Sequence, residues 1–232
     1  MIIAAKCAPC EDKLSWVKNA GLEAVELYLS KDYLKSIPGL IERCKKFALR
    51  YAVHAPTDGS GLKELRDLIR GIGAEVVIFH NIYWEDEWGD IVKYFQENPV
   101  RLCVENTYSS NEAVKFMRRY GIGRCLDLEH AQLECAGVYE DEFINIMQGV
   151  FHVHITGYTY GSKLWHTHIH YSPEHNRYLL SLLKKTGYSG FVVSEARPSL
   201  QSYAEFKRLR EFYEDWEKSC ENTQEIFKIY KK

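Results

Sequence analysis

The sequence predicts a single α/β domain folded as a (β/α)8 TIM barrel, and three observations favour this class. Eight short apolar runs recur along the chain, rich in Val, Ile or Leu and not cleanly alternating, as is typical of strands covered on both faces. Amphipathic segments fill most of the gaps between the runs. A length of 232 residues suits one undivided barrel. An open doubly wound sheet is the alternative, but no G-x-G-x-x-G motif follows the first run.

The expected elements alternate in regular order along the chain. The strands are expected over residues 2–5, 24–29, 51–55, 76–80, 101–105, 124–128, 151–155 and 191–195. The first helix is expected around Leu14, Val17 and Ala20, and the second around Leu34, Ile37, Leu40, Ile41 and Cys44. The other helices are expected over 60–72, 88–97, 110–120, 139–148, 175–187 and 199–218. Stop signals for helices follow or close several of them at Gly21, Gly73, Gly121 and Gly187.

This order places the barrel domain over residues 1–219 and leaves 220–232 as a polar, Lys-ended tail. Because the chain is short for eight repeats, the loops are expected to be short. The exception is a long loop over 156–174, which contains the segment LWHTHIHY (164–171).

Composition and charge narrow the classes of protein and partner. Hydrophobic residues make up 46% and charged residues 27%, which is ordinary for a globular protein. The net charge of −2 does not indicate the positively charged surface that binds nucleic acid or an anionic membrane. No run approaches the roughly 20 apolar residues of a membrane span, and the N-terminal run is too short for a signal peptide. We therefore expect a protein without membrane or nucleic-acid partners.

Seven cysteines, at positions 7, 10, 44, 103, 125, 135 and 220, are odd in number. Without an export signal they are expected to be reduced thiols in the cytoplasm. Cys7 and Cys10 form a C-x-x-C pair, which is consistent with redox chemistry or half of a zinc site, but no second pair exists. Cys103 and Cys125 are expected to face inward below the strand ends and to serve packing.

Polar residues gather where the expected strands end. Most of the nine histidines lie at strand ends or in the long loop, and Glu105, Asp127 and Glu195 lie within or close apolar strands. Barrel enzymes assemble their sites at the carboxyl ends of the strands. Since burying three unpaired carboxylates together is costly, histidines and a divalent cation are the expected compensation. Mixed imidazole and carboxylate ligands suit Zn²⁺, Mn²⁺, Fe²⁺ or Co²⁺.

These residues carry a resemblance to the xylose isomerase-like TIM-barrel superfamily, which contains sugar isomerases, epimerases and endonuclease IV. The matching segments are VHAP (53–56), IFHN (78–81), VENT (104–107), LDLEHA (126–131), HVHITG (152–157), HTHIHYS (166–172) and SEARP (194–198). They cover strands three to eight in the order of the family, and seven motifs in register are quite specific.

The resemblance implies a ligand set for one to three divalent ions, with Zn²⁺ or Mn²⁺ expected. The core ligands of the family correspond to Glu105, Asp127, His154 and Glu195. The further ligands of endonuclease-like members correspond to His54, His80, His130 and His168. The chain departs from that pattern at His166, where such members carry an Asp, which argues against a third metal. It departs again at Gly157, where many members carry an Asp.

The resemblance also implies an activity, namely isomerisation or epimerisation of a small sugar or related keto or hydroxy compound. In such enzymes two glutamates, here Glu105 and Glu195, exchange a proton with a substrate carbon while the metal stabilises the enediolate. A nuclease of the endonuclease IV type is the alternative, which the histidines favour and the acidic charge opposes. A third possibility is a barrel that binds metal or sugar without catalysing a reaction. Members of the family often pair, so a homodimer is an expected assembly.

Other residues near the strand ends are expected to contact substrate. Lys6 and Glu26 fit either substrate contacts or a buried ion pair. Asn106 and Arg197 directly follow expected ligands, and both are expected to reach substrate or to orient those ligands. Within LWHTHIHY, His168 is the expected ligand, His166 an expected substrate contact, and His170 a residue of the pocket rim. The segment is expected to be a loop that folds over the site.

Overall fold

The computed structural model describes the backbone of residues 1–136 and 140–229 and the side chains of 1–136 and 143–220. Within these ranges eight parallel strands close into a barrel in sequence order. They are β1 (Ile2–Cys7), β2 (Ala24–Tyr28), β3 (Arg50–His54), β4 (Val76–Phe79), β5 (Arg101–Glu105), β6 (Gly123–Asp127), β7 (Val150–Ile155) and β8 (Phe191–Ser194). The predicted (β/α)8 barrel is confirmed, and the eight expected strands lie within one or two residues of the observed ones.

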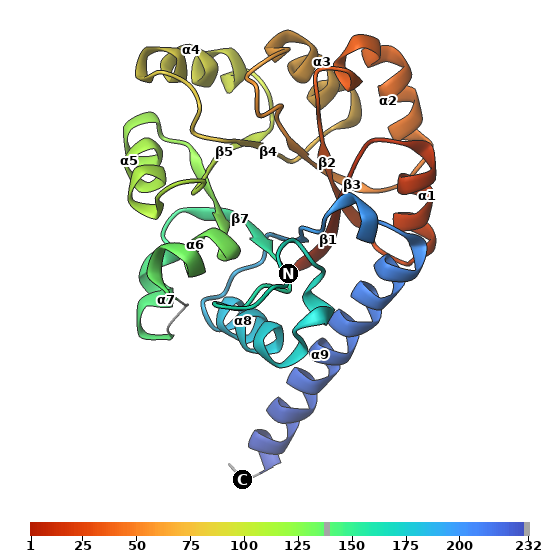
Figure 1. The fold of residues 1–232 in the computed structure, drawn as a ribbon, viewed down its shortest axis with the longest axis vertical. Coiled ribbons are helices and arrows are strands. Elements are labelled where there is room, and N and C mark those ends of the chain that lie inside the picture. Colours follow the sequence, from red (N-terminus) through yellow and green to blue (C-terminus); the bar gives the residue numbers. More distant parts are fainter. Residues whose placement is uncertain (137–139, 230–232) are drawn as a thin grey trace.

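Helices surround the barrel as an outer ring (Figure 1). They are α1 (Glu11–Asn19), α2 (Ile37–Lys45), α3 (Leu62–Ile72), α4 (Glu85–Gln96), α5 (Ser110–Tyr120), α6 (Leu128–Cys135), α7 (Glu140–Ile146), α8 (Pro173–Lys185) and α9 (Tyr203–Ile229). Short 3₁₀ helices η1 (Tyr33–Ser36), η2 (Ile169–Tyr171) and η3 (Pro198–Leu200) lie between them. None of the helices in the described ranges combines the length and apolar character that crossing a bilayer requires.

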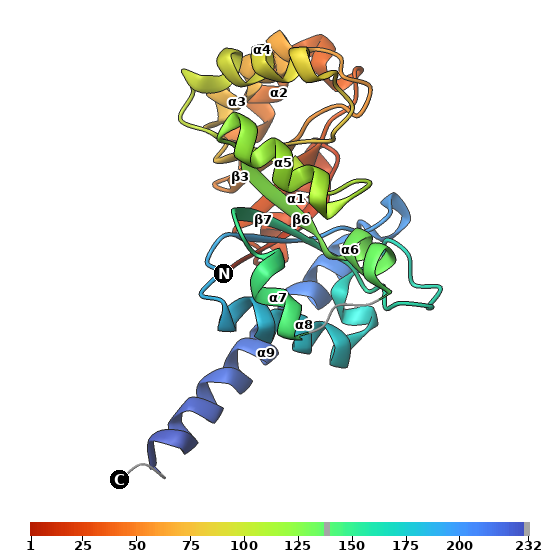
Figure 2. The same cartoon turned by 90° about the vertical axis from the view of Figure 1, so that its left-hand side faces the viewer.

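Two helices differ from the expected pattern. The helix α6 was not expected, and it begins directly at the end of β6 because the side chain of Asp127 accepts a hydrogen bond from the backbone N–H of His130 and caps it. The helix α9 continues to Ile229, through most of the segment expected to be a tail, and projects beyond the barrel (Figure 2). Residue 139 of one expected helix and residues 230–232 of the expected tail lie outside the described ranges.

The barrel interior is layered from apolar to polar along the strands. Its lower part is filled by small and medium apolar side chains, namely Ala4, Ala24, Ala52, Val76, Ile78, Cys103, Cys125, Phe191 and Val193. Inward side chains two positions further along each strand are polar, because successive residues alternate between the two faces of a strand. The expected inward, packed positions of Cys103 and Cys125 are confirmed. The polar layer therefore lies on an apolar floor at the carboxyl ends of the strands.

All seven cysteines are described, and none of them forms a disulfide bond. Cys7 is fully buried, and burial raises the pKa of its thiol to about 12. Cys10 lies partly exposed, with its Sγ 3.7 Å from the hydroxyl of Tyr33. A thiol with so high a pKa is a poor nucleophile at neutral pH, which disfavours redox chemistry at the C-x-x-C pair.

Candidate metal and active site

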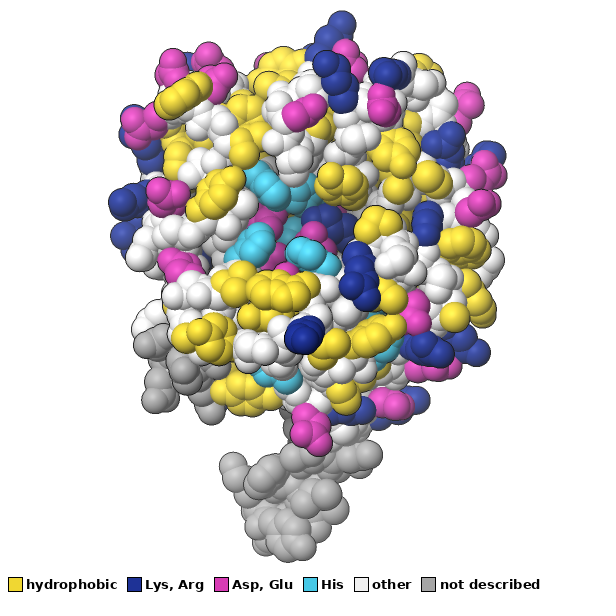
Figure 3. All heavy atoms as spheres, in the orientation of Figure 1, with side chains coloured by type: hydrophobic (Ala, Val, Ile, Leu, Met, Phe, Trp, Pro, Cys, Tyr) yellow, Lys and Arg dark blue, Asp and Glu magenta, His cyan; other side chains and the backbone are white. Residues whose placement is uncertain are grey.

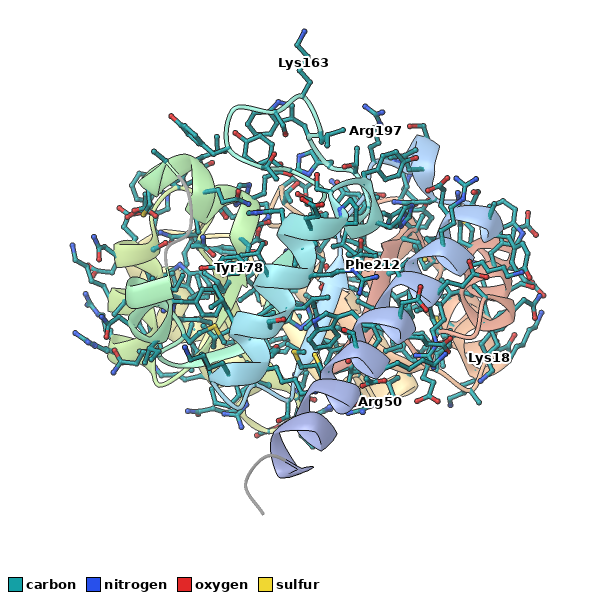
Figure 4. All side chains as sticks on the ribbon, turned by 90° about the horizontal axis from the view of Figure 1, so that it is seen from below. Lys18, Arg50, Lys163, Tyr178, Arg197 and Phe212 are labelled. Carbon is teal, nitrogen blue, oxygen red and sulfur yellow. The ribbon has the colours of Figure 1, made fainter. Side chains whose placement is uncertain are left out.

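The candidate site is a hollow at the carboxyl ends of the strands, where histidine side chains surround carboxylates and a basic side chain (Figure 3). Each strand contributes one residue from its last three positions or from the position just after it: Lys6, Glu26, His54, His80, Glu105, Asp127, His154 and Glu195. Arg50, at the first position of β3, lies at the opposite end of the molecule from the loops that carry Lys163 and Arg197 (Figure 4). The barrel thus gathers residues from across the whole sequence at one mouth.

Glu105 is the centre of the first group of ligand-type side chains. Its Oε2 lies 3.1 Å from Nε2 of His54 and 3.3 Å from Nε2 of His80, and its Oε1 lies 3.6 Å from Nδ1 of His130. Burial raises the pKa of the Glu105 carboxyl. The charge of His154 and hydrogen bonds from the histidines outweigh this effect and hold the pKa well below its usual range. Glu105 is therefore an anion that faces three imidazoles.

Asp127, His154 and Glu195 form the second group. Nδ1 of His154 lies 3.1 Å from Oε2 of Glu195, 3.8 Å from Oδ2 of Asp127 and 3.7 Å from Oε1 of Glu105. The first of these distances is that of an ion pair between buried atoms, and neither Nδ1 nor Oε2 has a well-formed hydrogen bond. Buried polar atoms without partners are rare and costly. Donor atoms of this triad lie within 4.8 Å of one another, so they fit a divalent cation between them.

Further polar side chains lie deeper in the barrel and contact the second group. Oε2 of Glu26 accepts hydrogen bonds from Nε2 of His152 at 2.6 Å and from Nε2 of His154 at 2.9 Å. Lys6 contributes an ammonium 3.3 Å from Oε1 of Glu26 and 3.0 Å from Oε1 of Glu195. Of the two alternatives expected for Lys6 and Glu26, the ion pair is observed. Lys6 thereby connects Glu26 to the candidate ligand Glu195. His152 was not expected to take part, although its position two residues before His154 on an inward face was a usable signal.

The electrostatics of the site follow from this packing. Burial opposes the charge of Lys6, but Glu195, Glu26 and Glu105 outweigh it and raise the pKa of the ammonium. Burial also raises the pKa of Glu195, yet Lys6 and His154 lower it by more. Burial disfavours a charged His154, whereas the acidic groups around it raise its pKa well above the usual value. Several buried carboxylates thus require nearby positive charge, which a divalent cation would supply in place of the proton on His154.

His168 lies outside the mouth, contrary to the position expected for a ligand. It is fully buried, with Nδ1 2.9 Å from Oγ of Ser194 and Nε2 3.2 Å from the carbonyl oxygen of Leu200. His170 stacks on it and pairs with Glu205 at 2.9 Å instead of lining the rim. Both nitrogens of His168 are therefore engaged in fastening the long loop to β8 and η3, and we leave His168 out of the proposed ligand set.

Of the two roles expected of Asn106, its contacts favour the orientation of a neighbouring ligand. Its side chain is 2% exposed, donates a hydrogen bond to the carbonyl oxygen of Asp127 at 3.0 Å and accepts one from the backbone N–H of Asp127 at 2.7 Å. Both ends of the buried amide thus hold the backbone of Asp127. Its position supports the expectation of orienting a neighbouring ligand.

His166 and Arg197 lie in the loops above the mouth. The backbone oxygen of His166 accepts a hydrogen bond from the backbone N–H of Arg197 at 2.8 Å, and the ring of His166 is 49% exposed. Figure 4 shows the side chains of Lys163 and Arg197 on this side of the molecule. The long loop is anchored at its base, where the backbone N–H of Gly157 donates to the carbonyl oxygen of Thr167 at 2.8 Å.

Comparison with known proteins identifies the family. A family model described as the xylose isomerase-like TIM barrel matches residues 80–216, more than half of the chain. The chain belongs to this family. A search of curated protein sequences found no match.

Solved structures share the xylose isomerase-like fold over nearly their whole length. An L-ribulose 3-epimerase has a TM-score of 0.69 and 16% identity, with 98% of each chain covered. A D-allulose 3-epimerase from Methylomonas sp. has a TM-score of 0.65 and 13% identity, covering 93% of this chain and 98% of that one. A Thermus thermophilus protein soaked with ZnCl2 has a TM-score of 0.65 and 17% identity, covering 93% and 99%. At such identities the likeness establishes the shared fold.

Proposed function

We propose that this protein is a metal-dependent isomerase or epimerase of a small sugar or a related keto or hydroxy compound. The observation that carries the proposal is the buried group of ligand-type atoms at the floor of the mouth, formed by Nδ1 of His154, Oε2 of Glu195 and the carboxylate of Asp127, in which neither Nδ1 nor Oε2 has a well-formed hydrogen bond. The family supports it, as do the two epimerases among the solved structures with this fold.

Glu105, Asp127, His154 and Glu195 would hold the cation, with Zn²⁺ or Mn²⁺ proposed from their mixture of imidazole and carboxylate donors. His54, His80 and His130 border the same carboxylate, Glu105, and are proposed as ligands of a second ion. When bound, the cation would polarise a substrate carbonyl and make the neighbouring C–H more acidic.

The proton transfer itself would rest on Glu105 and Glu195. These carboxylates close β5 and follow β8, and two strands lie between β5 and β8 in one direction around the barrel and four in the other. A small substrate between them would meet one carboxylate on each face, which is the arrangement that moving a proton from one face to the other requires. Lys6 fixes one oxygen of Glu195 at 3.0 Å and is proposed to keep this carboxylate oriented.

A cytoplasmic location is proposed as well, and it is supported by cysteines that form no disulfide bonds. A homodimer is proposed as the assembly that the resemblance implies. Light scattering of the purified protein measures the assembly directly.

The test is to purify the protein without a tag, measure its metal content, and assay it on a panel of aldoses and ketoses. Glu195→Gln is expected to retain bound metal and to lose activity by about 100-fold or more, because it removes an acid–base group. Glu42→Gln, on the exposed face of α2, serves as the matched control and is expected to change neither. A Glu195→Gln variant with bound metal and full activity would exclude the proposed proton transfer.

A second candidate function is favoured by the group of His54, His80 and Glu105. Their ligand atoms lie within 4.8 Å of one another, and Glu105 also lies in a group with Asp127 and His130. Two cations bridged by one carboxylate are typical of phosphoester hydrolases. The net charge of −2 opposes a DNA substrate. Cleavage of abasic DNA, together with an anomalous-scattering map that counts the ions at the mouth, distinguishes the two functions.

A further inference from the structure

His166 occupies a special place in the long loop above β7. Its backbone N–H donates to Oε2 of Glu129 at 3.2 Å, and its carbonyl oxygen accepts from the N–H of Arg197 at 2.8 Å. Glu129 follows Asp127 by two residues, and Arg197 follows Glu195 by two. His166 is therefore held between α6, which follows β6, and the loop that follows β8.

The backbone of His166 adopts a conformation that its side chain disfavours. Its φ is 44°, and apart from glycines only Ala136 shares a positive φ in the part of the chain that the structure describes. A non-glycine residue in this region is strained, and such strain persists only where surrounding contacts hold it. Here the two backbone hydrogen bonds hold it. Glycine would be easier to accommodate at this position, so the imidazole itself is the feature that requires an explanation.

Glu129 supplies the contacts that orient this imidazole. Its carboxylate is 2% exposed and accepts a hydrogen bond from Oγ1 of Thr156 at 2.6 Å as well as one from the backbone of His166. Its other oxygen lies 3.5 Å from Nδ1 of the His166 ring. A buried carboxylate at this nitrogen favours the tautomer that carries its proton on Nδ1. The second nitrogen, Nε2, is then left as an acceptor on a ring that is about half exposed.

We propose that His166 is a substrate-contacting acid–base residue of the site and that Glu129 is its positioning residue. The inference rests on the proposed isomerase or epimerase function. Nε2 would accept the proton of a substrate hydroxyl as negative charge forms on the substrate oxygens, and would return it to an oxygen when the new C–H bond forms. No net proton is consumed. A polyhydroxylated substrate, with a hydroxyl beside the reacting carbon, meets this requirement.

The competing interpretation is that His166 only holds the loop in place, as a latch, through its backbone hydrogen bonds. A latch needs the backbone of residue 166 but not the ring, because both latching bonds are made by backbone atoms. His166→Gly tests this directly, since it deletes the imidazole and accepts the positive φ without strain. Ala136→Gly is the matched control, because it relieves a similar backbone strain at the end of α6.

On the most active sugar of the panel, His166→Gly is expected to lower kcat by about 100-fold or more while metal content and fold are retained. Added free imidazole is expected to restore part of the activity, because it supplies the missing base. Ala136→Gly is expected to keep full kcat. Retention of kcat in His166→Gly, a loss explained by lost metal, or an absence of rescue would overturn the proposal.

A readout that needs no turnover separates this proposal from the proposed function. In ¹⁵N spectra of the histidine rings, the His166 signal is expected to report a proton on Nδ1 in the unmodified protein and to shift toward the Nε2–H tautomer in Glu129→Gln. Addition of xylitol as a polyol probe is expected to shift the same signal. If no sugar is turned over but these shifts occur, the proposed function fails while the paired residues and their contact with polyols stand. If xylitol leaves the His166 signal unchanged, the contact is refuted whatever the activity.

Discussion

Nε2 of His154 donates a hydrogen bond to Oε2 of Glu26 at 2.9 Å, and this bond determines which nitrogen of the ring faces the mouth. With Nε2 engaged below, Nδ1 is directed at Glu195, Asp127 and Glu105. A carboxylate that fixes the far nitrogen of a ligand histidine selects its tautomer and increases its basicity. Glu26 is therefore expected to influence the affinity of the proposed site for a metal ion without contacting the ion.

Replacement of Glu26 by Gln is expected to weaken binding of Zn²⁺ or Mn²⁺ by about 10–100-fold, because the neutral amide removes the charge that supports His154. Competition with a chromogenic chelator measures this affinity, and circular dichroism verifies that the variant is folded. Glu75→Gln, an exposed glutamate paired with Arg50 at the other end of the barrel, is the control. Equal affinities in all three proteins would contradict the assignment of Glu26.

Two hydrogen bonds join the side chain of Asn106 to the backbone of Asp127, and this brace leads to a prediction about stability. Asn106→Ala removes the partner of the buried N–H of Asp127 and one hydrogen bond to its carbonyl oxygen, at a cost of about 1–3 kcal/mol for the unsatisfied N–H. Thermal unfolding monitored by circular dichroism should show a lower Tm for this variant. The exposed Asn19→Ala, which removes only a hydrogen bond to Ser15, should leave the Tm nearly unchanged. A Tm for Asn106→Ala equal to that of the unmodified protein would show that the brace is dispensable.

The burial of His168 leads to a prediction about acid sensitivity. Burial, with a contribution from His170, lowers the pKa of His168 to about 4, below the ordinary value of 6.5. The unfolded chain then binds more protons than the folded one between these values, so the free energy of unfolding decreases as the pH falls from 6.5 to 4. The decrease attributable to this group is roughly 3 kcal/mol at most.

Urea unfolding of the unmodified protein and of His168→Gln at several pH values measures this contribution. The variant is expected to be less stable at pH 7, because the contacts with Ser194 and Leu200 are altered, but to lose less stability on acidification. Parallel curves for the two proteins would mean that other groups cause the acid sensitivity.

The fold was predictable because its signals are local. Parallel strands such as β4 and β8 are buried on both faces, so they are almost entirely apolar runs. Glycines such as Gly73 and Gly121 end helices in a left-handed conformation that few other residues adopt. The helix α6 escaped prediction because its start depends on the side chain of Asp127, a residue that the sequence pattern assigned to the metal site.

The strand-end residues of the site were predictable for the same reason, since an acid in an apolar strand is costly unless it is paired. That rule identified Glu105, Asp127 and Glu195, and it applied equally to Glu26. The loop residues followed no such rule. His166 and His168 alternate in one segment, yet the turn at His166 directs one ring toward Glu129 and the other into the core against Ser194. That choice depends on contacts with β8 and α6 that spacing in the sequence does not contain.

The absence of a side chain at Gly157 leads to the last prediction. A Cβ at this position would lie 2.3 Å from Oγ1 of Thr167 and 2.7 Å from the carbonyl oxygen of His168, which is closer than real contacts allow. The segment carrying His166 and His168 packs against β7 at this point, and a larger residue would lift it. Gly157→Ala is therefore expected to destabilise the protein by about 1–3 kcal/mol and to lower activity by displacing His166.

Gly89→Ala in α4, where an added Cβ would meet open space, is the matched control and should be neutral or stabilising. Thermal unfolding and kcat of the two variants, measured side by side, test the prediction. If Gly157→Ala behaved like Gly89→Ala in both measurements, the loop would have to be looser at its base than its contacts with Thr167 and His168 indicate. The Asp that many members of the family carry at this position would then be compatible with this loop, and the close approach could not explain the glycine.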